Sequence, residues 1–175
     1  MTEIRFESTI KIVQSHPVIR IPESAGQALP SRGMVMIKGT INGIPFETAL
    51  EPDGHGSHWF APSAALLQKL SIQPGDPLVF VVEPLKSWPE PKIPSDLQEA
   101  LISSNLTSQF NSITPRAQWE WIRWIRFTNN PETRARRIEV TCSKLNEGKK
   151  RPCCFDLSRC TDMSVCKSGM LVSTG

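Results

Sequence analysis

Hydrophobic and polar residues alternate along the first part of the chain in the way that is typical of β-strands. The opening run has apolar residues on one parity and polar residues between them, which predicts a half-buried strand. A second short strand is predicted over residues 18–21, before Pro22. The apolar positions of the opening run are Ile4, Phe6, Ile10 and Ile12.

A β-hairpin is predicted around Asn42-Gly43, which separates apolar-rich runs at residues 34–41 and 44–50. A two-residue type I′ turn needs positive φ at both central positions, which Asn tolerates and Gly adopts without steric cost. A Gly-rich loop follows the hairpin at residues 53–57.

The next pattern is a short helix over residues 62–70 and then a continuous apolar strand over residues 78–82. We expect this strand to be buried on both faces. Five short strands with one small helix and tight turns predict a small β-barrel or half-barrel over residues 1–84.

The spacing of apolar residues changes to a helical period in the second half. Four prolines between residues 84 and 94 indicate a stiff linker, assigned to residues 85–94. A helical region is predicted over residues 95–148. The Cys-rich basic tail, residues 149–175, has no periodicity, and we expect it to pack loosely. The fold class is therefore α+β.

Helix starts are marked by capping residues. Ser95 with Gln98 predicts a capping box, and Thr114 and Asn130 each precede a proline suited to the first helical position. The last helix carries an apolar stripe, in which the cysteine is a buried structural thiol. Its members are Ala135, Ile138, Cys142 and Leu145.

Composition fits an ordinary globular protein, with 39% hydrophobic and 21% charged residues in 175. No apolar run is long enough for a transmembrane helix and no signal peptide is evident, so we expect a cytoplasmic protein without membrane insertion. Residues 116–151 hold ten Lys and Arg against four Glu. This excess suggests an acidic partner for the C-terminal part, and a solvated basic helix face is the simpler alternative.

The loop after the hairpin contains Asp53, His55 and His58, which are all residue types that bind metals. Their spacing matches no recognised metal motif, so a polar loop is the preferred interpretation. His58 and Trp59 are expected to be partly buried, and His55, between two glycines, exposed. The loop is a candidate contact surface.

Four cysteines crowd into the tail, and we consider zinc binding, redox reactivity and unpaired thiols. Structural zinc sites favour Cys pairs two to four residues apart, whereas two of these cysteines are adjacent. Unpaired thiols are therefore preferred, no cofactor is predicted, and zinc is the alternative. The four are Cys153, Cys154, Cys160 and Cys166.

The helix that begins at Thr114 places Ala117, Trp121, Trp124 and Ile125 on one face, which we assign to the core. Trp119 falls nearly opposite, near two arginines, and could form a stacking platform. The alternative is that Trp119 covers a barrel edge. The basic residues of this surface are Arg123, Arg126, Arg134, Arg136 and Arg137.

Two motif groups resemble a known bacterial family. Residues 38–50, His58-Trp59 and Gly75-Asp76 resemble a barrel domain of unknown function. The segments 94–101, Trp124-Ile125 and 132–138 are similar to the YdeI/OmpD-associated, or bacteriocin-protection, region. The resemblance covers about residues 3–155. It implies a double-split barrel followed by helices, and a link to antimicrobial-peptide or envelope stress resistance without a defined mechanism.

No nucleophile motif or phosphate-binding loop occurs in the sequence, which favours a non-enzymatic protein over an enzyme. The leading hypothesis is a binding or adaptor protein for an unknown protein or small ligand. A nucleic-acid-binding protein that uses the basic helices, and a small-ligand or metal-binding protein, are the alternatives. We expect a monomer, because one chain supplies enough strands, with a dimer as the alternative.

Overall fold

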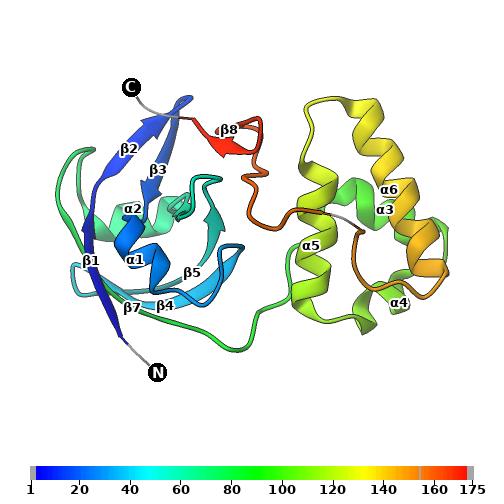
Figure 1. Ribbon diagram of the computed structural model, residues 1–175, viewed down its shortest axis with the longest axis horizontal. Coiled ribbons are helices and arrows are strands. Elements are labelled where there is room, and N and C mark those ends of the chain that lie inside the picture. Colours follow the sequence, from blue (N-terminus) through cyan, green and yellow to red (C-terminus); the bar gives the residue numbers. More distant parts are fainter. Residues whose placement is uncertain (1–2, 154, 173–175) are drawn as a thin grey trace. The chain divides into compact units, whose positions relative to one another are not determined.

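The computed structural model describes residues 3–153 and 155–172. The chain divides into two compact units, each built from more than one segment. The first holds the chain up to Lys86, Leu157–Cys160 and the residues from Ser164 onward, and the second holds Ser87–Asp156 with Thr161–Met163. The α+β class is confirmed: a curled antiparallel sheet comes first, and helices follow (Figure 1).

The first unit is a seven-stranded antiparallel sheet with the order β1-β7-β4-β5-β6-β3-β2. Its outermost strands, β1 and β2, are separated in the chain by Thr9 alone, so one bent segment joins both edges of the sheet (Figure 1). Helices α1 and α2 pack against this sheet. The elements are β1 Ile4–Ser8, β2 Ile10–Val13, β3 His16–Arg20, α1 Glu23–Gln27, β4 Val35–Ile41, β5 Ile44–Pro52, β6 His58–Phe60, α2 Ala64–Leu70 and β7 Leu78–Pro84.

The predicted hairpin is confirmed as β4 and β5. Asn42 and Gly43 have φ of 49° and 81°, and Ile41 pairs with Ile44 across the turn. The Asn42 side chain also accepts a hydrogen bond of 2.8 Å from the backbone N–H of Val79 on β7. The turn therefore fixes the register of β5 against β4, and it also helps to hold β7 beside β4.

Two of the predicted strand patterns are wrong in detail. Ile10 is buried as predicted, but Ile12 is exposed and Val13 is buried, because Val13 packs into a separate small cluster. The strand β7 is not buried on both faces, since Val79 is 42% exposed. One face of this antiparallel sheet is solvated, so its strand alternates between core and solvent.

The second unit contains helices whose starts follow the caps read from the sequence. The Thr114 hydroxyl accepts a hydrogen bond from Ala117 N–H, and the Asn130 side chain accepts from Glu132 and Thr133 N–H. The predicted capping box is wrong: Ser95 is already helical and Pro94 takes the cap position. The helices are α3 Ser95–Ser103, α4 Thr107–Ser112, α5 Pro115–Arg126 and α6 Pro131–Asn146.

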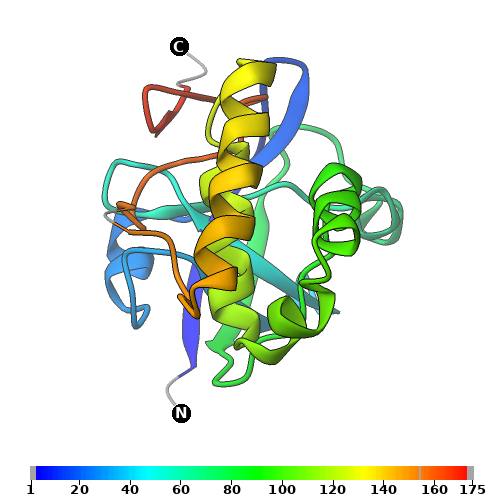
Figure 2. The ribbon, with the colours of Figure 1, turned by 90° about the vertical axis from the view of Figure 1, so that its right-hand side faces the viewer.

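The core of the helical unit lies between α5 and α6, which pack against each other, with α3 and α4 packed against α6. In Figure 2, α6 lies in front of α5. Ala117, Trp121 and Ile125 are buried as predicted, and Trp124 packs against them partly buried. On α6 Ile138 and Leu145 are buried as predicted, whereas Cys142 is only partly buried and Ala135 is exposed. In the described part of the chain no helix has the length and apolar character needed to cross a membrane.

The tail is more ordered than its composition predicts. Two short strands, β8 Cys166–Lys167 and β9 Met170–Leu171, form a hairpin within the first unit. A disulfide joins Cys160 to Cys166, and both side chains are buried in a cluster with Trp59. The tail therefore packs with residues of the sheet to form a second, smaller hydrophobic core in the first unit.

Candidate functional site

The loop after β5 is organised by the carboxylate of Asp53. This side chain is 4% exposed, and its Oδ1 accepts hydrogen bonds of 2.7 Å from His55 N–H and 3.0 Å from Ser57 N–H. The Asp53 backbone N–H also donates to the Ser57 carbonyl at 3.0 Å. One buried carboxylate thus closes a loop that contains two glycines with positive φ.

Two other segments hold the same aspartate in place. Its second carboxylate oxygen lies 4.0 Å from a guanidinium nitrogen of Arg20 on β3. Its carbonyl accepts a hydrogen bond of 2.8 Å from Leu171 N–H in the tail hairpin. A Cβ added to Gly54 would overlap the Gly169 backbone, so the loop and the tail approach as closely as a glycine allows.

A cavity of about 550 Å³ lined mostly by polar and charged residues, here called the Asp53 pocket, opens beside this loop. It is formed where the bend between β1 and β2, the end of β3 and the loop after β5 come together. Ser8, Thr9 and Ser57 contribute to its wall. Its ionisable residues are Glu7, Lys11, Arg20, Glu23, Asp53 and His55.

His55 lies at the rim of this pocket and is exposed, as expected from its flanking glycines. Its Nε2 is 3.3 Å from the Leu171 carbonyl oxygen. His58 and Trp59 are fully buried, so they do not form part of an accessible surface. The His58 Nε2 is 2.9 Å from the Gly33 carbonyl, and burial lowers the pKa of this imidazole below 6.5.

The predicted metal-binding residues do not form a cluster. Among the residues that the structure describes, no group of three His, Cys, Asp or Glu side chains is placed to hold a metal ion. The preferred prediction of unpaired thiols is wrong for Cys160 and Cys166, which are joined by a disulfide, whereas Cys153 is exposed. Cys154 lies outside the described residues.

The predicted platform around Trp119 is not exposed as a unit. Trp119 is partly buried, and its indole N–H donates to the Pro89 carbonyl at 3.4 Å. Arg123 is 2% exposed and its guanidinium lies 5.7 Å from the centroid of the Phe155 ring. Burial lowers the pKa of Arg123 to about 10, which leaves it protonated at neutral pH. Arg126 donates to the Thr161 hydroxyl at 3.0 Å.

The arginines of α6 are mostly engaged as well. Arg134 donates two hydrogen bonds, of 2.6 and 3.1 Å, to the carboxylate of Asp96 on α3, and this contact holds the pKa of Asp96 below its usual value. Arg137 donates to the carbonyls of Trp124 and Phe127 at 2.9 and 2.7 Å. Arg136 is exposed. These contacts fasten helices to one another, a role that the sequence pattern left open.

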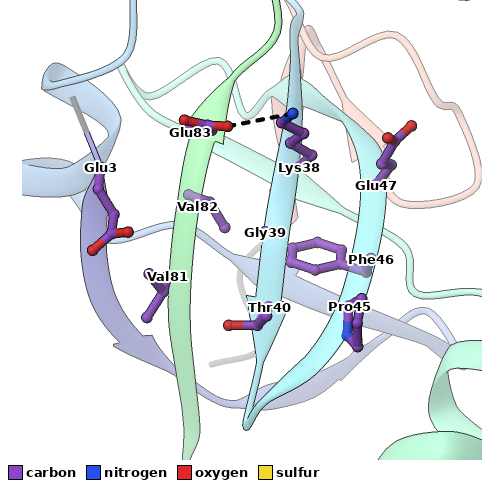
Figure 3. A pocket seen from close by; sticks show the side chains of 10 residues that line it. All are labelled: Glu3, Lys38, Gly39, Thr40, Pro45, Phe46, Glu47, Val81, Val82 and Glu83. Carbon is purple, nitrogen blue, oxygen red and sulfur yellow. Dashed lines mark ion pairs between the residues drawn. The ribbon is translucent and has the colours of Figure 1, made fainter. Parts of the chain in front are cut away.

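A second cavity, the Gly39 groove, was not predicted from the sequence. It has a volume of about 570 Å³ and is lined by residues of β4, β5 and β7 together with Glu3, just before β1 (Figure 3). Gly39 pairs with Phe46 on β5 and with Val82 on β7. Lys38 forms an ion pair of 3.5 Å with Glu83 at the groove. The glycine in the middle of an apolar strand was the one available signal, because such a residue often marks a close backbone approach.

Two family models match the chain, in the order that the motifs implied. Residues 6–82 match a domain of unknown function, DUF1905, and residues 90–148 match the family described as bacteriocin-protection, YdeI or OmpD-associated. No curated protein matches the chain significantly. The first match spans the curled sheet and the second spans the helices. The chain therefore carries a match to the DUF1905 domain followed by a match to the YdeI/OmpD-associated family.

Proposed function

We propose that this chain is a non-enzymatic cytoplasmic binding protein that holds the charged ends of a peptide in the Asp53 pocket. The observation that carries the proposal is that charged residues from three separate segments, 7–11, 20–23 and 53–57, line one cavity. The cavity volume of about 550 Å³ falls within the range usual for small-ligand sites.

The ionisable groups of the pocket support a ligand that carries both charges. Lys11 and Arg20 can bind a carboxylate, whereas Glu7 and Glu23 can bind an ammonium group. Asp53 is already engaged by two backbone N–H groups, so it acts mainly as the support of the loop. The family description of bacteriocin protection agrees with a peptide ligand, since bacteriocins are peptides and proteins.

The contacts of the basic helices make a nucleic-acid-binding role less well supported. A phosphate backbone is bound by Lys and Arg side chains that reach solvent. Arg123 is instead buried, Arg134 is paired with Asp96, and Arg137 binds two backbone carbonyls. Fewer positive side chains of residues 116–151 are therefore available to a phosphate backbone than the net charge of this segment suggests.

Calorimetric titration with trialanine tests the proposal, with N-acetylated and C-amidated trialanine as the uncharged probe. We expect trialanine to bind and the blocked peptide to bind at least ten times more weakly. Lys11→Gln should weaken binding about fivefold or more. Lys69→Gln is the matched control, because Lys69 is exposed on α2 and does not line the pocket.

Equal affinity for the free and blocked peptides, or equal effects of the two lysine substitutions, would contradict this assignment. The nucleic-acid alternative predicts a different result. Single-stranded DNA would then bind with an affinity that falls steeply with salt, and trialanine would have no effect.

A further inference from the structure

We propose that the Cys160–Cys166 disulfide is a redox-controlled latch, which holds the tail against the Asp53 loop (residues 53–57) and releases that loop when it is reduced. The inference rests on the proposed function in one respect, because the Asp53 loop forms one side of the proposed peptide pocket. The disulfide, the tail hairpin and the loop all lie in the first unit.

Cys166 is connected to the loop through one residue of the tail hairpin. In the pairing of β8 with β9, Cys166 lies opposite Leu171. The Leu171 N–H donates to the Asp53 carbonyl at 2.8 Å, and the Leu171 carbonyl oxygen lies 3.3 Å from the Nε2 of His55. The backbone of a single residue therefore joins this half of the disulfide to two residues of the loop.

Cys160 is connected to the loop through a second tail residue. Its backbone N–H donates to the Gly169 carbonyl at 2.9 Å. Gly169 in turn lies so close to Gly54 that a Cβ added to Gly54 would overlap the Gly169 backbone. Each cysteine thus contacts a tail residue that touches the loop, and the disulfide joins the two contacts.

The tail hairpin is short, so its order depends on the cross-link. The strands β8 and β9 have two residues each, and an isolated two-stranded hairpin is marginally stable at best. Val165 and Leu171 pack with residues of the sheet, in the same cluster as the two cysteines. A segment of this kind opens locally more easily than the sheet does, and opening exposes the buried disulfide to a reductant.

A dithiol opens the latch by thiol–disulfide exchange. One thiolate of the dithiol attacks the Sγ of one cysteine, the Cys160–Cys166 bond breaks, and the departing sulfur takes a proton. The second thiol of the reductant then displaces the other cysteine, so the dithiol leaves as a disulfide and both cysteines are thiols. A small-molecule disulfide reverses the exchange and is itself reduced to two thiols. In the cytosol of most organisms a protein disulfide is usually transient, catalytic or redox-sensing, which agrees with a latch in a cytoplasmic protein.

Hydrogen exchange followed by NMR tests the latch without any ligand. The amides of His55 and Ser57 are compared in the oxidised protein and after dithiothreitol under native conditions. We expect reduction to accelerate their exchange about tenfold or more, because the loop loses its tail contacts. The matched reference is the Val79 amide, which also donates to a side-chain oxygen, that of Asn42, and should change by less than about twofold.

Calorimetry with trialanine tests whether the latch controls the pocket. We expect reduction to weaken trialanine binding about threefold or more, because a loosened loop must be ordered again when the peptide binds. Oxidised glutathione, added after the dithiothreitol is removed, should restore both slow exchange and peptide affinity.

Cysteine variants make the test specific. The double variant Cys160→Ser, Cys166→Ser should exchange as the reduced protein does, with or without dithiothreitol. Cys142→Ser is the matched control, because it removes a partly buried thiol from α6 and keeps the disulfide. It should respond to dithiothreitol as the native protein does. The comparison of oxidised and reduced native protein needs neither variant.

Three results would overturn the latch. A disulfide that dithiothreitol reduces only in urea would be a permanent structural link. Exchange of His55 and Ser57 that rises no more than that of Val79 would show that the tail does not hold the loop. Equal trialanine affinity of the oxidised and reduced forms would show that the disulfide does not control the pocket. Failure of trialanine to bind either form would instead contradict the proposed function, and faster exchange on reduction would still support the latch.

Discussion

Removing the carboxylate of Asp53 should unfold the loop that it closes. In Asp53→Ala, the backbone N–H groups of His55 and Ser57 lose an acceptor that lies 2.7 and 3.0 Å away in the native protein. Ser57 is buried, so its N–H cannot be hydrated without local opening. An unsatisfied buried donor costs about 1–3 kcal/mol, and the more accessible His55 N–H adds about 1 kcal/mol.

The expected loss in the free energy of unfolding is therefore about 2–4 kcal/mol for Asp53→Ala. Asp53→Asn is the matched variant, because its amide oxygen can accept the same two hydrogen bonds and only the charge facing Arg20 is lost. That charge lies 4.0 Å from the guanidinium, and we expect a cost of about 1 kcal/mol or less.

Urea denaturation followed by circular dichroism measures both free energies, and hydrogen exchange of the His55 and Ser57 amides reports the loop directly. Exchange of both amides should accelerate strongly in the alanine variant and little in the asparagine variant. Variants that differ by less than about 0.5 kcal/mol would refute the idea that acceptance of two N–H bonds is what Asp53 contributes.

Other positions give equally direct expectations. Reducing the Cys160–Cys166 disulfide should lower the stability of the first unit by about 2 kcal/mol, from the entropy of a short closed loop, and urea denaturation with and without dithiothreitol measures it. Gly39→Ala should cost about 2 kcal/mol or more, because its Cβ would overlap the Val81 carbonyl, and a lower thermal midpoint would reveal it. The folded-state pKa of His58 is lowered by burial, so the unfolded chain binds a proton first as pH falls. Stability should therefore decrease below pH 6.5, and His58→Gln should flatten that decrease in urea titrations.

Local chemistry explains which elements could be predicted from the sequence. The turn at Asn42-Gly43 and the caps at Thr114 and Asn130 depend on neighbours within four residues, and all three are present in the structure. The Ser95 capping box failed because Pro94 took the cap position, so that Ser95 became the first helical residue. Turns and helix caps that depend on a few adjacent residues can thus be predicted from the sequence, unless a neighbouring residue takes the cap position instead.

Long-range features were harder to read. The burial of Val13 depends on Trp59 and on a tail more than 140 residues away in the chain, and alternation alone placed Ile12 inside instead. The sequence singled out Asp53 and His55, but Lys11 joins them only through the bend between β1 and β2, and Arg20 only through the pairing of β3 with β6. The Gly39 groove combines three strands, and no local pattern of apolar residues encodes it.

The interleaved path of the chain has a consequence for biosynthesis. The first unit contains residues from both ends of the described chain, including Leu157–Cys160 and the hairpin after Ser164. When synthesis has reached only the end of β7, the tail residues that bury Val13, Val18 and Trp59 have not yet been made. Domains usually fold as they emerge, amino-terminal part first. Here the strands of the barrel are synthesised before the helices, but the barrel is completed only after them, so the helices can form first.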